Sequence, residues 1–348
     1  MHRINKMNKT ISGLFTAFCI FCSCTPHTGK VSPVEVQQAG SLPADTAVRN
    51  ETAPIEKTLT PEQIQITKDF LYDRYTPDDI YPYKDTTRQF QWDKIKERLA
   101  LLENIQLQPA EWGILRNYKN RNGEAPLVRK FKRNAYGRVA DTLGTERYQS
   151  VPLYLPTDTS VPERYGRDGA PVRLTGNKGT FVKAEPVLIK GEWMIPKKYV
   201  KTLGDTIVFN KAVFVDRNNQ NIATLERVGK GKWAVRSMNP ATTGRHLPPY
   251  AQETPLGMFV VQEKKKKMIY LKDGSKEIGG YAPYASRFTD GAYIHGVPVN
   301  APRKAQIEYS PSLGTTPRSH MCVRNATSHA KFIFDWAPVN ETTVFVLE

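Results

Sequence analysis

The sequence predicts a mainly β protein with a short helical region in its N-terminal part. Three observations favour this fold class. From about residue 126 to the end, short runs of β-branched and aromatic residues alternate with Gly, Pro and Asp, as strands alternate with turns. Two segments before that point carry helix signals. With 348 residues, of which 39% are hydrophobic, the chain is large enough for two or three packed units.

Residues 1–24 have the features of an export signal. Basic residues precede the apolar run ISGLFTAFCIF, and Ser23 stands directly before Cys24. The run is short for a membrane span. The stretch FCSC resembles a bacterial lipobox, which implies cleavage after Ser23 and lipidation of Cys24. Phe21 departs from the usual leucine, and an ordinary signal peptide cut elsewhere, or a signal anchor, stays an alternative.

A linker and a helical region are predicted to follow. Residues 25–60 are poor in large apolar side chains, which is typical of a flexible linker. Residues 61–125 form the predicted helical region. The segment 59–75 begins with Thr60 as a helix N-cap, and its apolar residues allow a helix. The segment 90–106 carries apolar residues at three- and four-residue spacing and predicts an amphipathic helix.

Residues 126–205 predict a small β-barrel, because several short strand-like runs are separated by turn signals. The sequence GEWMIPKKYVKTL resembles the closing segment of a bacterial SH3-like module. Modules of that kind often bind cell-wall peptide. We interpret Tyr154, Tyr165, Trp193 and Tyr199 as core or rim aromatics in preference to a ligand groove.

The last part of the chain, 206–348, is again strand-like, and it ends in the strand-like run VFVL. The run DRNNQ (216–220) predicts a hairpin turn, and AKFIFDW (330–336) fits a helix or a strand. The run Lys264 to Lys267 predicts a solvated hairpin tip.

The formal net charge of +16 suggests a polyanionic neighbour, namely nucleic acid, anionic lipid or acidic wall polymer. Nucleic acid is disfavoured because zinc-finger spacing, basic-region and ribonucleoprotein motifs are missing.

Cys322 is the residue whose chemistry most needs an explanation. If the signal is removed, it is the one thiol besides Cys24, so it is either buried and inert or reactive. Histidine is the usual base for such a nucleophile. His320 lies two residues away and would face the same way in an extended strand. His295 ends an apolar strand, and Gly296 behind it permits close backbone approach.

These residues carry a resemblance to the catalytic domain of L,D-transpeptidases, the YkuD family. His295 and Gly296 match the upstream HG pair of that family, and SHMCVRN (319–325) matches its later cysteine motif. TPLGMF (254–259) and YAPYASRF (281–288) resemble two further family segments. The resemblance implies a β-sandwich catalytic domain over the part of the chain that follows the predicted barrel.

Two departures from the family pattern bear on activity. The interval from His295 to Ser319 (319 − 295 = 24) is longer than usual, which implies an inserted loop. Met321 replaces a glycine next to the nucleophile. If that position needs a positive φ, methionine costs about 1 kcal/mol or more, whereas an extended backbone would accept it freely.

The resemblance implies roles for particular residues. Cys322 would be the nucleophile and His295 its base, held by the Gly296 carbonyl. N–H groups near Met321 and Cys322, with help from His320, would stabilise the oxyanion. The substrate-binding residues implied in addition to Met321 are Arg324, Tyr284, Ser286 and Arg287.

Three functions stay open on the sequence. The first is a peptidoglycan L,D-transpeptidase, lipid-anchored at the periplasmic face of a bacterial membrane, with stem peptides as partners and no metal or cofactor. The second uses the same chemistry with another acceptor, either water, as in an L,D-carboxypeptidase, or a protein amine. The third is a non-catalytic wall-binding lipoprotein with an SH3-like module. The sequence makes no prediction of oligomeric state.

Overall fold

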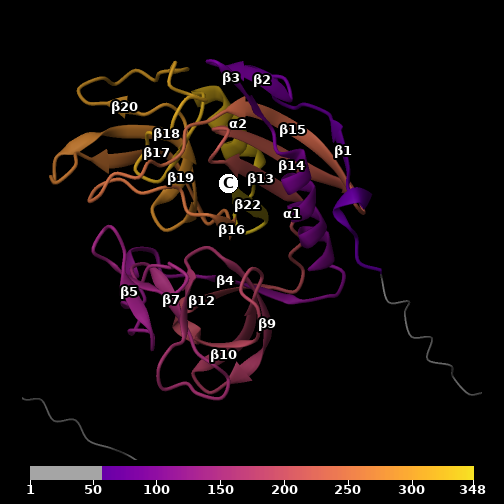
Figure 1. Ribbon diagram of the computed structural model, residues 1–348, viewed down its shortest axis with the longest axis vertical. Helices are drawn as coiled ribbons and strands as arrows, with labels where there is room; N and C mark the ends of the chain where they lie inside the picture. Colours follow the sequence, from indigo (N-terminus) through magenta and orange to yellow (C-terminus); the bar gives the residue numbers. More distant parts are fainter. Residues whose placement is uncertain (1–56) are drawn as a thin grey trace, which may run out of the picture. The chain divides into compact units, whose positions relative to one another are not determined.

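The computed structural model describes residues 57–348, which belong to one compact unit (Figure 1). The predicted signal, its Cys24 and nearly all of the predicted linker lie outside the described residues. Within the described part the chain is mainly β, as predicted, with two α-helices and several sheets. No helix in this part is long and apolar enough to cross a membrane.

The largest sheet has six strands in the order β1-β15-β14-β13-β22-β16. Its members are β1 (Gln65–Lys68), β13 (Lys211–Asp216), β14 (Asn221–Gly229), β15 (Lys232–Pro240), β16 (Gly257–Val260) and β22 (Thr342–Leu347). The hairpin predicted around DRNNQ is confirmed, since β13 and β14 pair antiparallel across it. The final strand predicted from VFVL is also confirmed and lies parallel to β13.

A second sheet, in the order β17-β18-β19-β21, carries part of the cysteine motif at its edge. Its strands are β17 (Glu263–Leu271), β18 (Ile278–Thr289), β19 (Ala292–His295) and β21 (Val323–Arg324), and β20 (Val299–Asn300) pairs with β18. The segment AKFIFDW proves to be helical and belongs to α2 (Thr327–Trp336).

The two sheets and their helices enclose two apolar cores. In β13, Val213 and Val215 face the second sheet and α2, whereas Ala212 and Phe214 face the core beneath α1 (Trp92–Asn104). Because side chains alternate along a strand, this arrangement means that β13 is buried on both faces. Figure 1 shows α1 running beside β13 and β14. The helix predicted over 90–106 is therefore confirmed.

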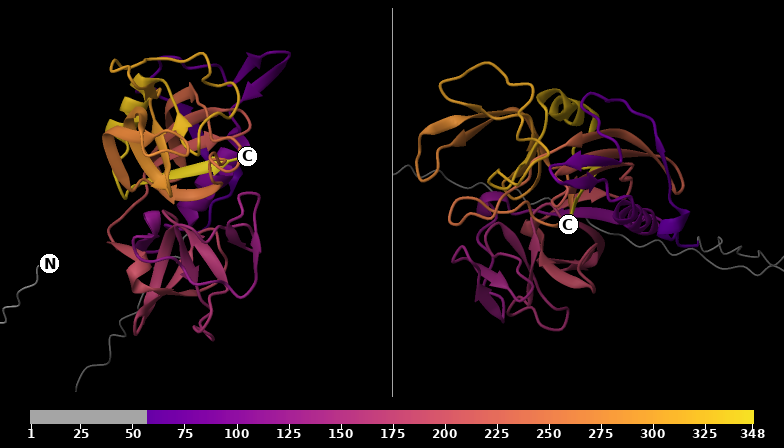
Figure 2. Two further views of the ribbon diagram at one scale, coloured as in Figure 1. Left: turned by 90° about the vertical axis from the view of Figure 1, so that its left-hand side faces the viewer. Right: turned by 45° about the horizontal axis from the view of Figure 1, so that its top comes forward.

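The third sheet has five strands in the order β11-β10-β9-β4-β12, all neighbours antiparallel (Figure 2). They are β4 (Glu111–Leu115), β9 (Pro171–Lys178), β10 (Phe181–Pro186), β11 (Trp193–Pro196) and β12 (Val200–Gly204). Trp193 and Tyr199 pack in its core, as interpreted from the sequence. β4 comes from before residue 126, so the sheet starts earlier than the predicted module. The SH3-like barrel stays a prediction.

Short elements complete the described part. Three two-stranded hairpins and three 3-10 helices are present: β2 (Ile80–Tyr83) with β3 (Thr86–Gln89), β5 (Phe131–Arg133) with β6 (Val139–Asp141), β7 (Ser150–Leu153) with β8 (Arg164–Arg167), η1 (Pro61–Gln63), η2 (Tyr118–Asn120) and η3 (Lys197–Tyr199).

The helix predicted over 59–75 is wrong. The capping box at Thr60 and Gln63 forms, but it caps only the single turn η1. The chain then enters β1, which pairs in parallel with β15 from Gln65 opposite Lys232. The β-branched residues of β1 suit an extended ladder better than a helix. An available sheet edge therefore overrides the local helix signal.

The lysine run also differs from its prediction. Lys264 to Lys267 lie within β17, an edge strand, and the tip of the β17–β18 hairpin is formed by the residues after β17. Lys267 stacks over the Tyr281 ring, with Nζ 4.2 Å from the ring centroid. Charged side chains on an edge strand oppose pairing with another chain. We therefore interpret the run as edge protection.

A buried ion pair joins the five-stranded sheet to the second sheet. Asp168, between β8 and β9, is fully buried and binds the Arg287 guanidinium at 2.6 Å. The same carboxylate accepts the backbone N–H groups of Asn117, Tyr118 and Asp290 at 2.8, 3.0 and 3.2 Å. Because a buried charge must be paired and hydrogen-bonded, this carboxylate stabilises the junction.

Candidate active site

The register of β19 against β21 places the predicted nucleophile and base on one face of a sheet. The strands are parallel, with Ile294 opposite Val323 and His295 opposite Arg324. Ile294 and Val323 are buried in the core. Side chains alternate along a strand, so Cys322, His295 and Arg324 project from the opposite face.

His295 is oriented by the backbone immediately after it. Its imidazole is 4% exposed, and its Nδ1 lies 2.6 Å from the carbonyl oxygen of Gly296. A carbonyl can only accept, so Nδ1 carries the hydrogen and Nε2 keeps a free electron pair. Burial, assisted by the Arg324 charge, lowers the pKa of His295 to about 4. The ring is therefore a neutral base at pH 7.

Gly296 is required by close packing. A Cβ at this position would lie 2.7 Å from the Thr327 hydroxyl and 2.9 Å from Pro283. The Gly296 N–H donates to the Pro283 carbonyl at 2.9 Å, which fixes the peptide that holds His295. A larger residue would shift the carbonyl and release the imidazole.

Cys322 is only partly buried, and its thiol lies 3.6 Å from the carbonyl oxygen of Gly291 in the β18–β19 turn. Burial raises the pKa of the Cys322 thiol, against the opposing effects of the Tyr293 N–H and the Arg324 guanidinium. The thiol is therefore protonated at rest and needs a base before it can react.

Met321 has a φ of +150°, a region that favours glycine. Two hydrogen bonds hold it there. The Thr254 hydroxyl donates to the Met321 carbonyl at 2.8 Å, and the Met321 N–H donates to the Ser319 hydroxyl at 3.3 Å. The Cα of Met321 also packs against Gly244, where a Cβ would approach it to 2.8 Å. Surrounding contacts thus impose the strained backbone, and the sequence-based concern about this position is justified.

We expect glycine at position 321 to be more stabilising than alanine, the reverse of the usual order in extended backbone. Both substitutions remove the methionine side chain, but only Met321→Gly relieves the positive φ. The two variants should therefore differ by about 1 kcal/mol in unfolding free energy in favour of glycine. Urea titrations of the two variants measure this difference. A Met321→Ala protein as stable as Met321→Gly would contradict the strain.

Arg324 belongs to a cluster of three arginines near the thiol. Burial, together with the nearby charges of Arg245 and Arg318, lowers the pKa of Arg324, against a raising effect of Cys322. Its Nε is buried without a hydrogen-bond partner. Within residues 57–348 none of the three guanidinium groups forms an ion pair with a carboxylate. This concentration of positive charge suits a substrate carboxylate.

Four other predicted site residues have different surroundings. The His320 imidazole contacts the Asp273 carboxylate at 3.0 Å, and both side chains are 48% exposed. That contact engages Nε2 of the ring, so help to an oxyanion would fall to Nδ1, and this role of His320 stays a prediction. Arg287 is committed to the buried pair with Asp168.

Tyr284 and Ser286 face the wrong side of the sheet for substrate binding. Ser286 pairs with Ile294, the residue of β19 that points into the core, and it is 1% exposed. Tyr284 packs edge-on against Phe334 of α2, with ring centroids 5.9 Å apart. These contacts do not support a substrate contact by Tyr284 or Ser286, which stays a prediction.

Several functional neighbours were missed in the sequence. Thr254 and Gly291 touch the backbone or thiol of the cysteine motif, and Arg245 and Arg318 add positive charge near Arg324. Thr254 stands in the segment TPLGMF, so that motif was the available signal. Among the described residues, no cluster of His, Cys, Asp and Glu side chains is suited to hold a metal ion.

Comparison with known proteins identifies the class of domain that this geometry belongs to. Residues 210–346 match the family model YkuD, the L,D-transpeptidase catalytic domain. The match covers about two fifths of the chain, so over this stretch the chain is similar to an L,D-transpeptidase catalytic domain. No curated protein matches the chain significantly.

Solved structures give similar but distant matches. An L,D-transpeptidase from Mycobacterium smegmatis is 16% identical, with 51% of this chain and 82% of that chain covered and a TM-score of 0.33. L,D-transpeptidase 3 from Mycobacterium tuberculosis, in complex with a faropenem-derived adduct, is 20% identical, with 51% and 79% covered and a TM-score of 0.32. A fused amidase/peptidase protein from Clostridium acetobutylicum is 18% identical, with 40% of this chain and only 52% of that chain covered and a TM-score of 0.30.

Proposed function

We propose that this protein is a peptidoglycan L,D-transpeptidase that works through a cysteine acyl-enzyme. The observation that carries the proposal is the β19–β21 register, which directs Cys322, His295 and Arg324 from one face of the sheet. The match of residues 210–346 to the L,D-transpeptidase catalytic domain supports the substrate class.

The proposed first half-reaction begins with proton transfer from the Cys322 thiol to Nε2 of His295. The thiolate attacks the carbonyl between the third stem residue and the terminal D-Ala. The resulting oxyanion is stabilised by the N–H of Cys322 and by that of Met321, which would have to leave the Ser319 hydroxyl to reach it. His295 then protonates the leaving amine, so that D-Ala departs and a thioester remains.

In the second half-reaction an amine of a neighbouring stem attacks the thioester. His295 accepts the amine proton and returns it to the departing thiolate, which restores the free enzyme with a new peptide bond. Arg324, with Arg245 and Arg318 beside it, is proposed to bind a stem carboxylate and set the direction of attack. Water as the acceptor would give an L,D-carboxypeptidase instead.

The test follows the products formed from a disaccharide tetrapeptide by mass spectrometry. The proposal predicts release of D-Ala together with a cross-linked dimer. Release of D-Ala with tripeptide alone would replace the transpeptidase by a carboxypeptidase. A third outcome, no turnover together with binding to sacculi, would replace the enzyme by a wall-binding protein in which the strained Met321 backbone has closed the site.

The pH profile should reflect the low pKa of His295. A histidine with the ordinary pKa of about 6.5 would be only about one-tenth neutral at pH 5.5. His295, with its pKa of about 4, stays neutral there, so falling pH should not remove the base until near pH 4. We expect the rate of Cys322 acylation by a carbapenem to fall less than about twofold between pH 7 and 5.5. A tenfold fall over that range would contradict the buried neutral base.

A peptidoglycan-acting domain implies an extracytoplasmic location, and we propose that lipidation of Cys24 anchors the protein to a membrane on that side. Cells that produce the Cys24→Ala protein should then lose it from the membrane fraction and should not attach labelled fatty acid to it. Labelling equal to that of the unaltered protein would exclude Cys24 as the anchor.

A further inference from the structure

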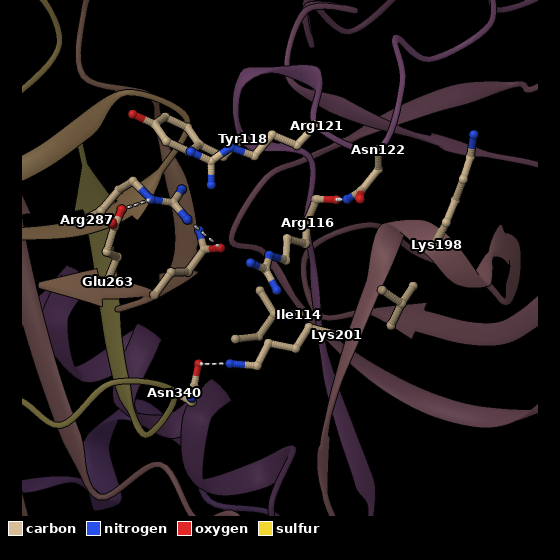
Figure 3. A pocket seen from close by; sticks show the side chains of 12 residues that line it. Ile114, Arg116, Tyr118, Arg121, Asn122, Lys198, Lys201, Glu263, Arg287 and Asn340 are labelled. Atoms are coloured by element: carbon tan, nitrogen blue, oxygen red, sulfur yellow. Dashed lines mark hydrogen bonds and ion pairs between the residues drawn. The ribbon is translucent and has the colours of Figure 1, made fainter. Parts of the chain in front are cut away.

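The described part of the chain contains a cavity that is separate from the cysteine site. It has a volume of about 590 Å³ and is lined by the five-stranded sheet on one side and by residues at the start of β17 and in β18 on the other (Figure 3). Neither Cys322 nor His295 lines it. Volumes of this size are ordinary for a binding site of a small molecule or peptide.

The cavity is lined by an excess of positive charge. Arg116, Arg121, Lys198 and Lys201 all contribute to its wall. Within the described part of the chain, none of these four side chains forms an ion pair with a carboxylate. The acidic residue of the wall, Glu263, is already engaged by the Arg287 guanidinium at 3.4 Å and by Lys265 at 3.2 Å.

The cations also oppose one another. Burial, and then the neighbouring charge of Arg116, lowers the pKa of Lys201. Its Nζ donates to the side-chain oxygen of Asn340 at 3.0 Å, a neutral partner. An anion in the cavity would relieve this repulsion and supply the missing charge.

The arrangement of the cations favours an extended ligand over a compact one. Figure 3 shows Arg116, Arg121, Lys198 and Lys201 at separate places around the cavity instead of converging on a single point. Ile114 lines the space between them. A guanidinium can bind both oxygens of one carboxylate through two N–H groups, and the Ile114 side chain suits the aliphatic parts of a peptide.

We propose that this cavity binds an acidic peptide, with two or more carboxylates held by Arg116, Arg121, Lys198 and Lys201. The site would hold such a peptide without any contribution from Cys322. The Tyr118 hydroxyl, in the cavity wall, lies 3.4 Å from that of Tyr293 in β19. An occupied cavity would thus adjoin the strand that carries His295.

The test is calorimetric titration of the full-length protein, in a non-ionic detergent, with capped tetraglutamate. Capped tetraserine and inorganic pyrophosphate serve as the other two ligands. The double variant Arg116→Gln/Lys198→Gln removes two cavity cations. Lys130→Gln/Lys276→Gln removes the same charge from exposed positions that do not line the cavity. The Cys322→Ala protein shows whether the active-site thiol contributes.

We expect tetraglutamate to bind, to lose affinity as salt is added, and to bind at least about tenfold more weakly to the cavity variant. Affinity should be unchanged in the exposed-charge control and in Cys322→Ala, and tetraserine should not bind. The proposal is overturned if the cavity variant and the control weaken binding equally, or if tetraglutamate does not bind. Tighter binding of pyrophosphate than of tetraglutamate would replace the acidic peptide by a phosphate ligand.

Discussion

Replacing Cys322 by alanine is expected to abolish both D-Ala release and carbapenem labelling, with turnover lower by at least about 10³-fold. The reason is that the β19–β21 register and the alternation of side chains along β21 place the thiol on the same sheet face as His295. The alanine variant should keep the urea midpoint of the unaltered protein, because the Cys322 side chain is only partly buried. Turnover is measured by mass spectrometry of tetrapeptide products.

Two results would contradict this account of Cys322. One is residual turnover within tenfold of the unaltered protein, which would require another nucleophile. The other is loss of activity together with a large fall in urea midpoint, which would indicate that Cys322 acts in packing. The His295→Gln variant is the companion measurement. Glutamine keeps a polar side chain of similar reach but cannot act as the base, so both variants should fail at the acylation step.

The second large effect is expected at the junction of the sheets. Asp168→Ala should lower the unfolding free energy by about 3 to 5 kcal/mol, because the buried Arg287 guanidinium would keep only the more distant and partly exposed Glu263 as a counter-charge. The backbone N–H of Asp290 would also lose its acceptor. Asp290 immediately precedes Gly291, whose carbonyl contacts the Cys322 thiol, so activity should fall as well. Urea unfolding and carbapenem labelling measure the two effects.

The matched control is Asp158→Ala. Asp158 also pairs with an arginine, Arg129, but both side chains are well exposed, at 39% and 47%. Exposed pairs contribute little to stability, so this variant should unfold close to the unaltered protein. If Asp168→Ala were no more destabilising than Asp158→Ala, the buried pair would not be what joins the two sheets.

Local sequence patterns predicted much of the fold, because the apolar face of a helix and the turn of a hairpin depend on residues that are close in the sequence. The apolar spacing of 90–106 defines one face of α1, and the turn residues DRNNQ define the β13–β14 hairpin. The segment 59–75 failed for the opposite reason. Its structure depends on the edge of β15, far along the chain, and no local pattern carries that information.

The site was predictable in part for similar reasons. Motif spacing singled out Cys322 and His295, the proposed nucleophile and base, but it could not show which face of the sheet each neighbouring side chain points to. Ser286 lies opposite Ile294 and therefore points into the core, where a shift of one residue would have pointed it at the site. Asp168, the partner of Arg287, comes from the turn between β8 and β9, and such a long-range pairing leaves no trace in a single sequence.

The most direct test of the central claim is to trap the acyl-enzyme. The protein is mixed with disaccharide tetrapeptide, quenched in acid within seconds, digested and mapped by mass spectrometry. The proposal predicts an adduct on the peptide that contains Cys322, with the mass of the substrate less D-Ala, and no adduct on the Cys322→Ala protein. Release of D-Ala without any adduct on that cysteine, or an adduct on another residue, would contradict the account.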